Sequence, residues 1–254
     1  MNIAWVMATR DRHLCVERVL RTFLDQNYEG NIVLWIYNNS REAFELNMPP
    51  LPENKKIILQ HQFKDSKTND FYENVGFIYN DIMDQLPTLK EKTGWDIDAI
   101  TFTEDDDLYL PIHTKEGAKG MKKARGQDKF AYKPFQSYYK TKESIQLMHN
   151  VFEPSIFIDY EYITHPETRM RETSMDYHFG WLQPLIDNNS LLVDEEGVPT
   201  LIYDWSGEIP VYKLSGSGDN SVKNYNNYKF YSKAEKSILT PISEEKAKEY
   251  YKIN

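Results

Sequence analysis

Residues 3–40 read IAWVMATRDRHLCVERVLRTFLDQNYEGNIVLWIYNNS, and their pattern decides the fold class. Residues 3–8 are a short apolar run that is typical of a buried strand. Apolar side chains then recur at helical spacing over residues 14–24, after Thr9 and Asp11, two residue types that favour helix starts. A second apolar run, residues 31–37, ends in a polar turn. The segment therefore predicts a strand, a helix and a second strand.

The same alternation continues to residue 103. Residues 56–59 predict a third, short strand, an apolar stripe over residues 71–86 predicts a helix, and residues 99–103 predict a fourth strand. Such repetition is typical of a mostly parallel sheet with helices on its faces, whose ligands bind beyond the carboxyl ends of the strands. We therefore predict an α/β fold in which the turns after residues 8, 37 and 103 meet at one edge.

The pattern changes after Pro111. A basic stretch and a segment rich in Tyr and Phe come first, residues 156–160 are strand-like, and residues 174–186 are helix-like. The sequence has no internal repeat and no linker that would separate two domains. We therefore expect one domain, residues 1–254, with a variable second half.

The composition narrows the class of protein. The chain has 254 residues, 40% hydrophobic and 27% charged, which is typical of a folded protein. Cys15 is the only cysteine, so no internal disulfide can form and a reducing compartment is expected. No apolar run reaches the roughly 20 residues that span a bilayer, and Met1 leads directly into the first strand. These features predict a cytoplasmic protein, and the net charge of −9 weighs against a general nucleic-acid binder.

Three aspartates, Asp105, Asp106 and Asp107, follow the fourth strand and are the strongest indication of chemistry. Adjacent carboxylates repel one another, and in a partly dry cleft this costs free energy unless a cation neutralises them. Their oxygens suit Mg²⁺ or Mn²⁺, which keep open positions for phosphate oxygens. The alternative is a solvated acidic turn. The position at the end of a buried strand favours a metal site.

At this point the sequence resembles the family 2 glycosyltransferases, which have the GT-A fold, over roughly residues 1–190. It looks most like the spore-coat polysaccharide member of that family. The motifs that carry the resemblance are Thr9-Arg10-Asp11-Arg12 after the first strand, Gln26-Asn27-Tyr28 after the first helix, Tyr37-Asn38-Asn39-Ser40 after the second strand, and ITFTEDDDLYLP at residues 100–111.

The resemblance implies a metal-dependent, inverting hexosyl- or pentosyltransferase with a nucleotide-sugar donor, most simply a UDP-sugar. Residues 1–111 would bind the donor, residues 112–214 would hold the acceptor and the catalytic base, and residues 215–254 would form a tail. Asp105 and Asp107 would hold Mn²⁺ or Mg²⁺ against the diphosphate leaving group. Asp106 would share that task or contact the ribose.

Further donor contacts are implied at the first two strand ends. Thr9, Arg10 and Arg12 belong to the first motif, and Arg10 either stacks on the base or binds phosphate. Asn38 stands where the family has an aspartate that accepts a hydrogen bond from uracil, and an amide oxygen can accept the same bond. This departure leaves the base open. For both positions the alternative is an ordinary polar turn.

An inverting transfer needs a base that takes the proton of the acceptor hydroxyl. Asp176, in the stretch SMDYHFGW at residues 174–181, matches the position that the family gives this carboxylate. Its other interpretation is a helix cap. Glu172 is the second candidate for the base, and His178 is expected to pack or to support the site.

The acceptor is expected to be a glycan or a lipid-linked saccharide. Residues 115–142 carry a surplus of positive charge with interleaved Tyr and Phe, which also permits phage DNA with hydroxymethylated bases as an alternative acceptor. A solvated lysine-rich helix explains the same charges. Two other classes stay open: a nucleotidyltransferase, although no glycine-rich loop follows the first strand, and an inactive sugar-binding module.

Overall fold

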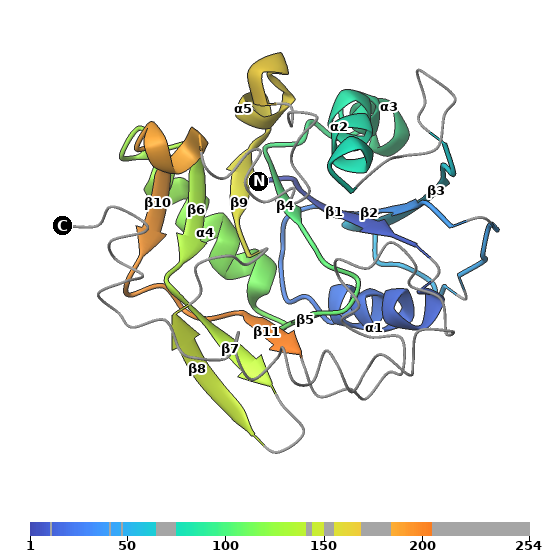
Figure 1. Ribbon diagram of the computed structural model, residues 1–254, viewed down its shortest axis with the longest axis horizontal. Helices are drawn as coiled ribbons and strands as arrows, with labels where there is room; N and C mark the ends of the chain where they lie inside the picture. The colour runs from blue at the N-terminus through green and yellow to red at the C-terminus, as the bar shows by residue number, and fades with distance from the viewer. Residues whose placement is uncertain are drawn as a thin grey trace.

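Figure 1 shows the computed structural model of the chain, which describes residues 1–10, 12–40, 42–46, 48–64, 75–140, 144–149, 155–168 and 184–204. The central feature is a seven-stranded sheet in the order β10-β6-β9-β4-β1-β2-β3. Its strands are β1 (Ile3–Thr9), β2 (Ile32–Asn38), β3 (Lys55–His61), β4 (Ala99–Phe102), β6 (Ala131–Pro134), β9 (Phe157–Asp159) and β10 (Leu191–Asp194).

The sheet is mainly parallel. Strand β1 pairs in parallel with both β2 and β4, β2 pairs with β3, and β6 pairs with β10. Strand β9 lies antiparallel between β4 and β6. The strands predicted at residues 3–8, 31–37, 56–59 and 99–103 are confirmed with boundary shifts of one or two residues, and the predicted α/β class is confirmed with them.

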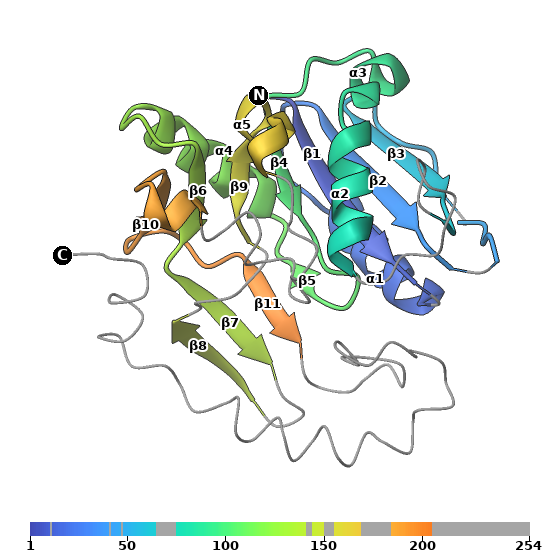
Figure 2. The same cartoon turned by 45° about the horizontal axis from the view of Figure 1, so that its top comes forward.

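Helices cover both faces of this sheet, as Figure 2 shows. Alternate side chains of β1 and β2 point to opposite faces. On one face they pack against α1 (His13–Leu24) and α4 (His113–Arg125). On the other face they pack against α2 (Val75–Gln85), α3 (Thr88–Thr93) and α5 (Tyr160–Thr164), which precedes the 3-10 turn η1 (Pro166–Thr168). None of the helices in the described part of the chain has the length and apolar character needed to cross a bilayer.

Two glycines let α4 lie unusually close to the sheet. A Cβ atom on Gly117 would come within 2.1 Å of the Phe157 ring, and one on Gly120 within 2.2 Å of the Tyr132 ring. Both distances are far below van der Waals contact, so the helix can reach this position only with glycine there. The close approach fixes the start of α4, which follows directly on the acidic turn and β5.

A second sheet extends the fold below the first, in the order β5-β11-β7-β8. Its strands are β5 (Leu108–Tyr109), β7 (Gln136–Lys140), β8 (Ile145–His149) and β11 (Leu201–Asp204). The sequence did not predict this sheet. Most of the predicted helix at residues 174–186, and the whole tail from residue 215, lie outside the described residues.

Candidate functional site

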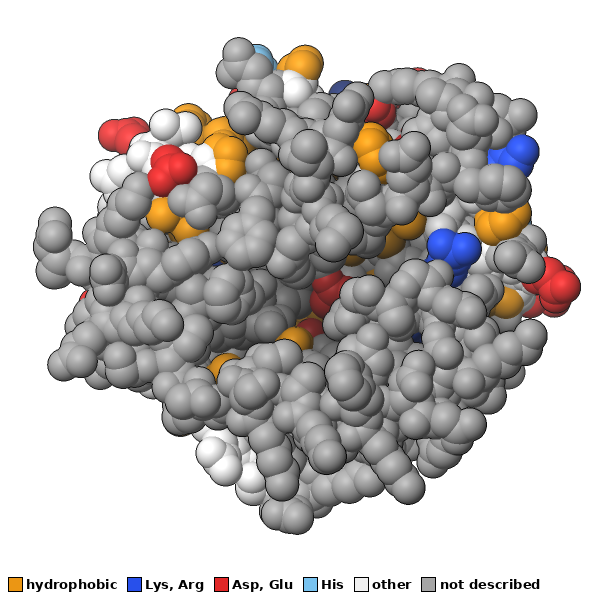
Figure 3. All heavy atoms as spheres, in the orientation of Figure 1, with side chains coloured by type: hydrophobic (Ala, Val, Ile, Leu, Met, Phe, Trp, Pro, Cys, Tyr) orange, Lys and Arg blue, Asp and Glu red, His pale blue; other side chains and the backbone are white. Residues whose placement is uncertain are grey.

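The carboxyl ends of β1, β2 and β4 meet at one edge, as predicted. The carbonyl oxygen of Thr9 accepts a hydrogen bond of 2.7 Å from the backbone N–H of Asn39, which joins the turns after β1 and β2. The N–H of Thr103, just after β4, donates to the carbonyl of Val6 at 2.9 Å. Acidic side chains are visible in a hollow of this face, over the carboxyl end of β4 (Figure 3).

The acidic run itself is buried at this edge. The exposed fractions are 4% for Asp105, 4% for Asp106 and 0% for Asp107. A surface turn of solvated carboxylates would be largely exposed, so burial excludes the solvated acidic turn as the explanation of this motif. The backbone N–H of Glu104 donates to the hydroxyl of buried Tyr109 at 2.7 Å, which holds the start of the turn against β5.

Two residues of the first motif contact Asp105 directly. The hydroxyl of Thr9 donates to Asp105 Oδ2 at 2.7 Å. Arg12 Nη1 donates to Asp105 Oδ1 at 2.8 Å and to Asp106 Oδ2 at 3.2 Å. Arg12 is only 7% exposed, and its carbonyl oxygen accepts the first backbone hydrogen bonds of α1 from Cys15 and Val16. The start of α1 thus places a buried cation on Asp105, a predicted metal ligand, and on its neighbour Asp106.

The charged groups at this site shift one another's pKa values. Burial raises the pKa of Asp105, Arg12 opposes the shift by favouring the carboxylate, and Asp106 adds to it. For Arg12, burial alone would lower the pKa, but the carboxylates of Asp105 and Asp106 outweigh it and the pKa is raised. Arg12 is therefore a permanent positive charge at this edge.

The carboxylates have the chemistry that a hard divalent ion needs. One oxygen each from Glu104, Asp105 and Asp106 can be chosen so that all three lie within 4.8 Å of one another. Such oxygen donors fit Mg²⁺ or Mn²⁺. Asp107, predicted as a ligand together with Asp105, follows directly in the same buried turn. Its role stays a prediction, and Glu104 joins the candidates.

Gln26, in the second motif, hydrogen-bonds to the segment that follows the acidic turn. Its amide nitrogen donates to the carbonyl of Leu110 at 2.8 Å, and its amide oxygen accepts from the N–H and hydroxyl of Thr114 at 2.9 and 3.0 Å. Beside it, the N–H of Asn27 donates to the carbonyl of Pro111 at 2.7 Å. The motif thus ties α1 to the segment that follows the aspartates, a role that the sequence did not reveal.

At the end of β2, Asn38 is fully buried and bonded within its own turn. Its amide oxygen accepts from the N–H of Ser40 at 2.9 Å, and its amide nitrogen lies 3.3 Å from His61 Nδ1. Its predicted contact with the base stays a prediction. Arg10 is half-buried and directly follows β1. Strand β1 is the neighbour of β4, which leads into the acidic turn.

Asp176 lies outside the described residues, as do Glu172 and His178. The prediction of the catalytic base is therefore not tested by the structure. Tyr79 of α2 belongs to the predicted apolar stripe and is fully buried near the acidic turn. Burial raises the pKa of Tyr79, and the charges of Glu104 and Asp105 raise it further.

The acceptor stays a prediction, but of the four aromatic side chains that interleave with the basic residues three are buried and Tyr138 is half-buried. Tyr132, Phe135 and Tyr139 are buried, so the expectation that they stack on a ligand is wrong for these three. The exposed basic residues of α4 are paired in part. The ion pairs are Lys119 with Glu116 at 2.7 Å, Lys123 with Asp194 at 2.8 Å and Arg125 with Asp159 at 2.7 Å.

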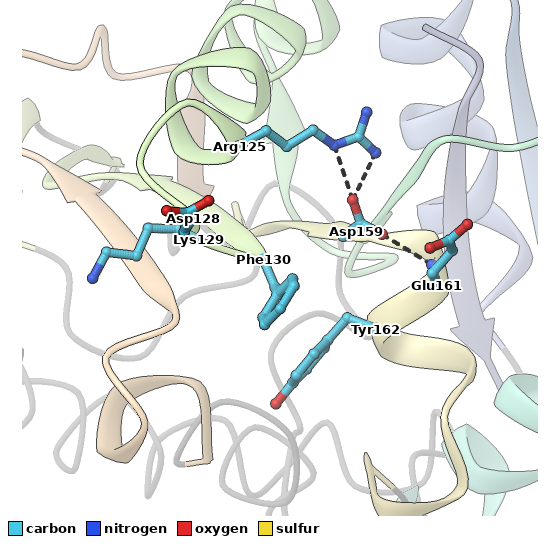
Figure 4. A pocket seen from close by; sticks show the side chains of 7 residues that line it. All are labelled: Arg125, Asp128, Lys129, Phe130, Asp159, Glu161 and Tyr162. Atoms are coloured by element: carbon cyan, nitrogen blue, oxygen red, sulfur yellow. Dashed lines mark hydrogen bonds and ion pairs between the residues drawn. The ribbon is translucent and has the colours of Figure 1, made fainter.

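A separate pocket of about 280 Å³ lies at the opposite edge of the main sheet (Figure 4). Asp159 lines it and pairs with Ala99, the first residue of β4, so the pocket is at the amino end of that strand. The rings of Phe130 and Tyr162 stack there, with centroids 5.2 Å apart. This pocket takes no part in the site at the carboxyl ends.

His113, at the start of α4, should make the stability of the protein depend on pH. It is buried among the rings of Trp5, Tyr109 and Phe157, and burial lowers its pKa to about 3. Below pH 6.5 the unfolded chain takes up a proton that folded His113 does not. The free energy of unfolding should therefore fall as the pH drops from 6.5 toward 3, by up to about 1.4 kcal/mol per pH unit from this residue.

The check is urea denaturation at several pH values for the wild type and His113→Phe, since the variant should lose this part of the pH dependence. Thr200 is the control, because its hydroxyl lies 2.8 Å from His113 Nδ1. Thr200→Val should lose stability, by about 1 kcal/mol, at every pH and keep the slope. Equal slopes for the wild type and His113→Phe would show that folded His113 titrates normally.

Comparison with known proteins comes from structure alone, because no protein-family model and no curated protein matches the sequence. The solved structures of S. aureus TarS are similar. TarS 1-349 in complex with UDP-GlcNAc has a TM-score of 0.60 at 9% identity, covering 99% of this chain and 70% of that chain. The chain has the GT-A fold.

Two further TarS structures agree. TarS 1-349 gives a TM-score of 0.53 at 10% identity, and its complex with UDP gives 0.52 at 9% identity. In both, the match covers 82% of this chain and 61% of that chain, so this chain spans less than two thirds of the TarS fragment. The predicted GT-A fold is confirmed, whereas the likeness to the spore-coat member stays a prediction.

Proposed function

We propose that this protein is a metal-dependent, inverting glycosyltransferase that moves a sugar from a UDP-sugar to a hydroxyl group of a glycan or lipid-linked saccharide. One observation carries the proposal: buried carboxylates lie at the carboxyl end of β4, beside the end of β1, in a GT-A fold. Parallel sheets bind their ligands at this edge. Residues 1–111 supply the donor site in this proposal.

The donor site would be formed by residues that the structure brings together. Asp105 and Asp107 would hold Mn²⁺ or Mg²⁺, as the resemblance implies. Oxygens of Glu104, Asp105 and Asp106 lie within 4.8 Å of one another, and Asp107 follows directly in the chain. When bound, the ion would act as a Lewis acid on the departing diphosphate. Thr9 orients Asp105 by donating its hydroxyl hydrogen. Asp176 would take the acceptor proton, as the family resemblance implies.

The choice of a uridine donor is supported by the TarS structures, two of which contain UDP or UDP-GlcNAc. In this chain, Asn38 would contact the base, and Arg10 would stack on it or bind phosphate. The acceptor is proposed as a glycan or lipid-linked saccharide because the family resemblance implies it. Several cations of the basic segment are paired, which weakens the support for DNA as the alternative.

A donor screen by thermal shift tests the proposal. UDP-sugars should raise the melting temperature in Mn²⁺ and not in EDTA, because a ligand that binds only the folded state stabilises it, by about 2.7 kcal/mol at 100 times its Kd. A shift with GDP-, ADP- or CMP-sugars alone would contradict the uridine assignment. A shift with free nucleoside triphosphates and with no nucleotide-sugar would favour the nucleotidyltransferase alternative.

A further inference from the structure

We propose that Arg12 is a built-in cation of the acidic turn, which keeps the affinity for a free divalent ion low until an anionic ligand enters with the metal. The inference rests on the proposed function for the identity of that ligand, a nucleoside diphosphate group. In this proposal Arg12 positions the carboxylates and couples the binding of the metal to the binding of the donor.

The geometry places Arg12 on two of the carboxylates that a metal would use. A single nitrogen, Nη1, bridges Asp105 Oδ1 at 2.8 Å and Asp106 Oδ2 at 3.2 Å. Asp105 and Asp106 also belong to the cluster whose oxygens lie within 4.8 Å of one another. An ion that coordinates these oxygens must displace the guanidinium or share the carboxylates with it. Either way the two cations repel each other.

The burial of this group makes the repulsion strong. Arg12 is 7% exposed and the two carboxylates are 4% exposed each, so water screens their charges poorly. Loss of Arg12 would remove the cation that contacts Asp105 and Asp106 among the described residues, and breaking a buried ion pair by removing one partner is strongly destabilising. Arg12 therefore stabilises the metal-free protein by the same contacts that compete with a metal.

Arg12 also keeps unused hydrogen-bonding capacity. Its Nε atom is buried and has no hydrogen-bond partner among the described residues. Buried donors without partners are rare, and a guanidinium binds phosphate oxygens well. A diphosphate that enters with the metal would add negative charge beside both cations and would offer Arg12 a new acceptor. Metal and diphosphate should then strengthen each other's binding by the same factor.

The experiment measures Mn²⁺ binding by calorimetry and by the EPR signal of free Mn²⁺, on the full chain without any nucleotide. Arg12→Met and Arg12→Gln remove the charge and should raise the affinity for Mn²⁺ at least about 10-fold. Arg12→Lys keeps the charge and should stay within about 3-fold of the wild type. In EDTA the two neutral variants should melt at a lower temperature than the wild type, and Mn²⁺ should restore them more than it stabilises the wild type.

Arg21→Met is the matched control. Arg21 is exposed in the last turn of the same helix, nine residues on and hence about 13 Å along the axis, beyond the Debye length of about 8 Å at physiological salt. Its loss should leave Mn²⁺ affinity unchanged. If Arg12→Met does not fold without metal, Arg12→Gln gives the same comparison, and folding of either variant only in Mn²⁺ supports the proposal.

The outcomes separate the inference from the proposed function. Equal Mn²⁺ affinities in the wild type and both neutral Arg12 variants would overturn the inference, even if UDP-sugars bind with metal. For the coupling, wild-type Mn²⁺ affinity should rise at least about 10-fold with saturating UDP. If UDP leaves it unchanged while the neutral variants gain affinity, the coupling to a diphosphate fails, whereas the role of Arg12 as counter-cation stands. The thermal-shift screen then decides separately whether a UDP-sugar is the donor.

Discussion

Asp107→Asn and Asp105→Asn should each lower metal-dependent binding of a UDP-sugar by about 100-fold or more. Asparagine keeps the size of the side chain and removes the charge on which a hard divalent ion depends. Even partners that only orient metal ligands cost 10- to 100-fold in metal affinity when lost, so a direct ligand should cost at least as much. The measurement is calorimetric titration with the donor in Mn²⁺ and in EDTA.

Asp96→Asn is the control for both variants. Asp96 precedes β4, at the opposite end of the strand from the acidic turn, and its exposed side chain forms an ion pair with Lys90. The control should bind donor like the wild type. An Asp105 or Asp107 variant that binds donor with unchanged Mn²⁺ dependence would show that the replaced residue is not a ligand, and Glu104 and Asp106 would be tested next.

Asp176→Asn should lower the rate of transfer by about 100- to 10,000-fold, which is the usual cost of losing a general base. Donor affinity should be nearly unchanged, because a general base acts on the acceptor hydroxyl and not on the diphosphate. Initial rates at saturating donor, with calorimetry on the same samples, separate the two effects.

Glu172→Gln serves as the matched variant at the neighbouring candidate. It should keep most of the activity if Asp176 is the base, and the reverse pattern would assign the role to Glu172. The anomeric configuration of the product gives an independent check. A product that retains the configuration of the donor would contradict the single displacement in which Asp176 takes part.

The first half of the fold could be predicted because its signals are strong and local. Strands β1 and β2 are continuous apolar runs buried on both faces, and α1 between them has a clear apolar stripe. The meeting of the turns after residues 8, 37 and 103 then follows from the parallel arrangement. The position of the acidic turn was predicted for this reason.

The second half gave weaker signals. Strand β5 has two residues, too few for a periodic pattern, whereas β9 lies within the strand-like residues 156–160 and confirms that prediction. The insertion of β9 antiparallel between β4 and β6 depends on contacts between segments far apart in the sequence, which local patterns do not report. Likewise, the burial of Tyr132 in a basic segment follows from the close approach of α4 at Gly120.

The site shows the same limit at the level of single contacts. The sequence indicated that three carboxylates need a cation, and it placed Arg12 in a donor-binding motif. It could not show that Arg12 itself contacts Asp105 and Asp106, because nothing in the spacing of residues 12 and 105 reports their distance. The brace from Gln26 to Thr114 was hidden for the same reason.

The most direct test of the central claim is the release of UDP from UDP-sugars, followed by chromatography with and without an acceptor glycan. We expect the wild type to release UDP in Mn²⁺, by slow hydrolysis without acceptor and faster with it, and to stop when EDTA is added. Asp105→Asn and Asp107→Asn should release none above background. A wild-type protein that binds a UDP-sugar in the thermal-shift screen but never releases UDP would contradict the account and would identify a sugar-binding module.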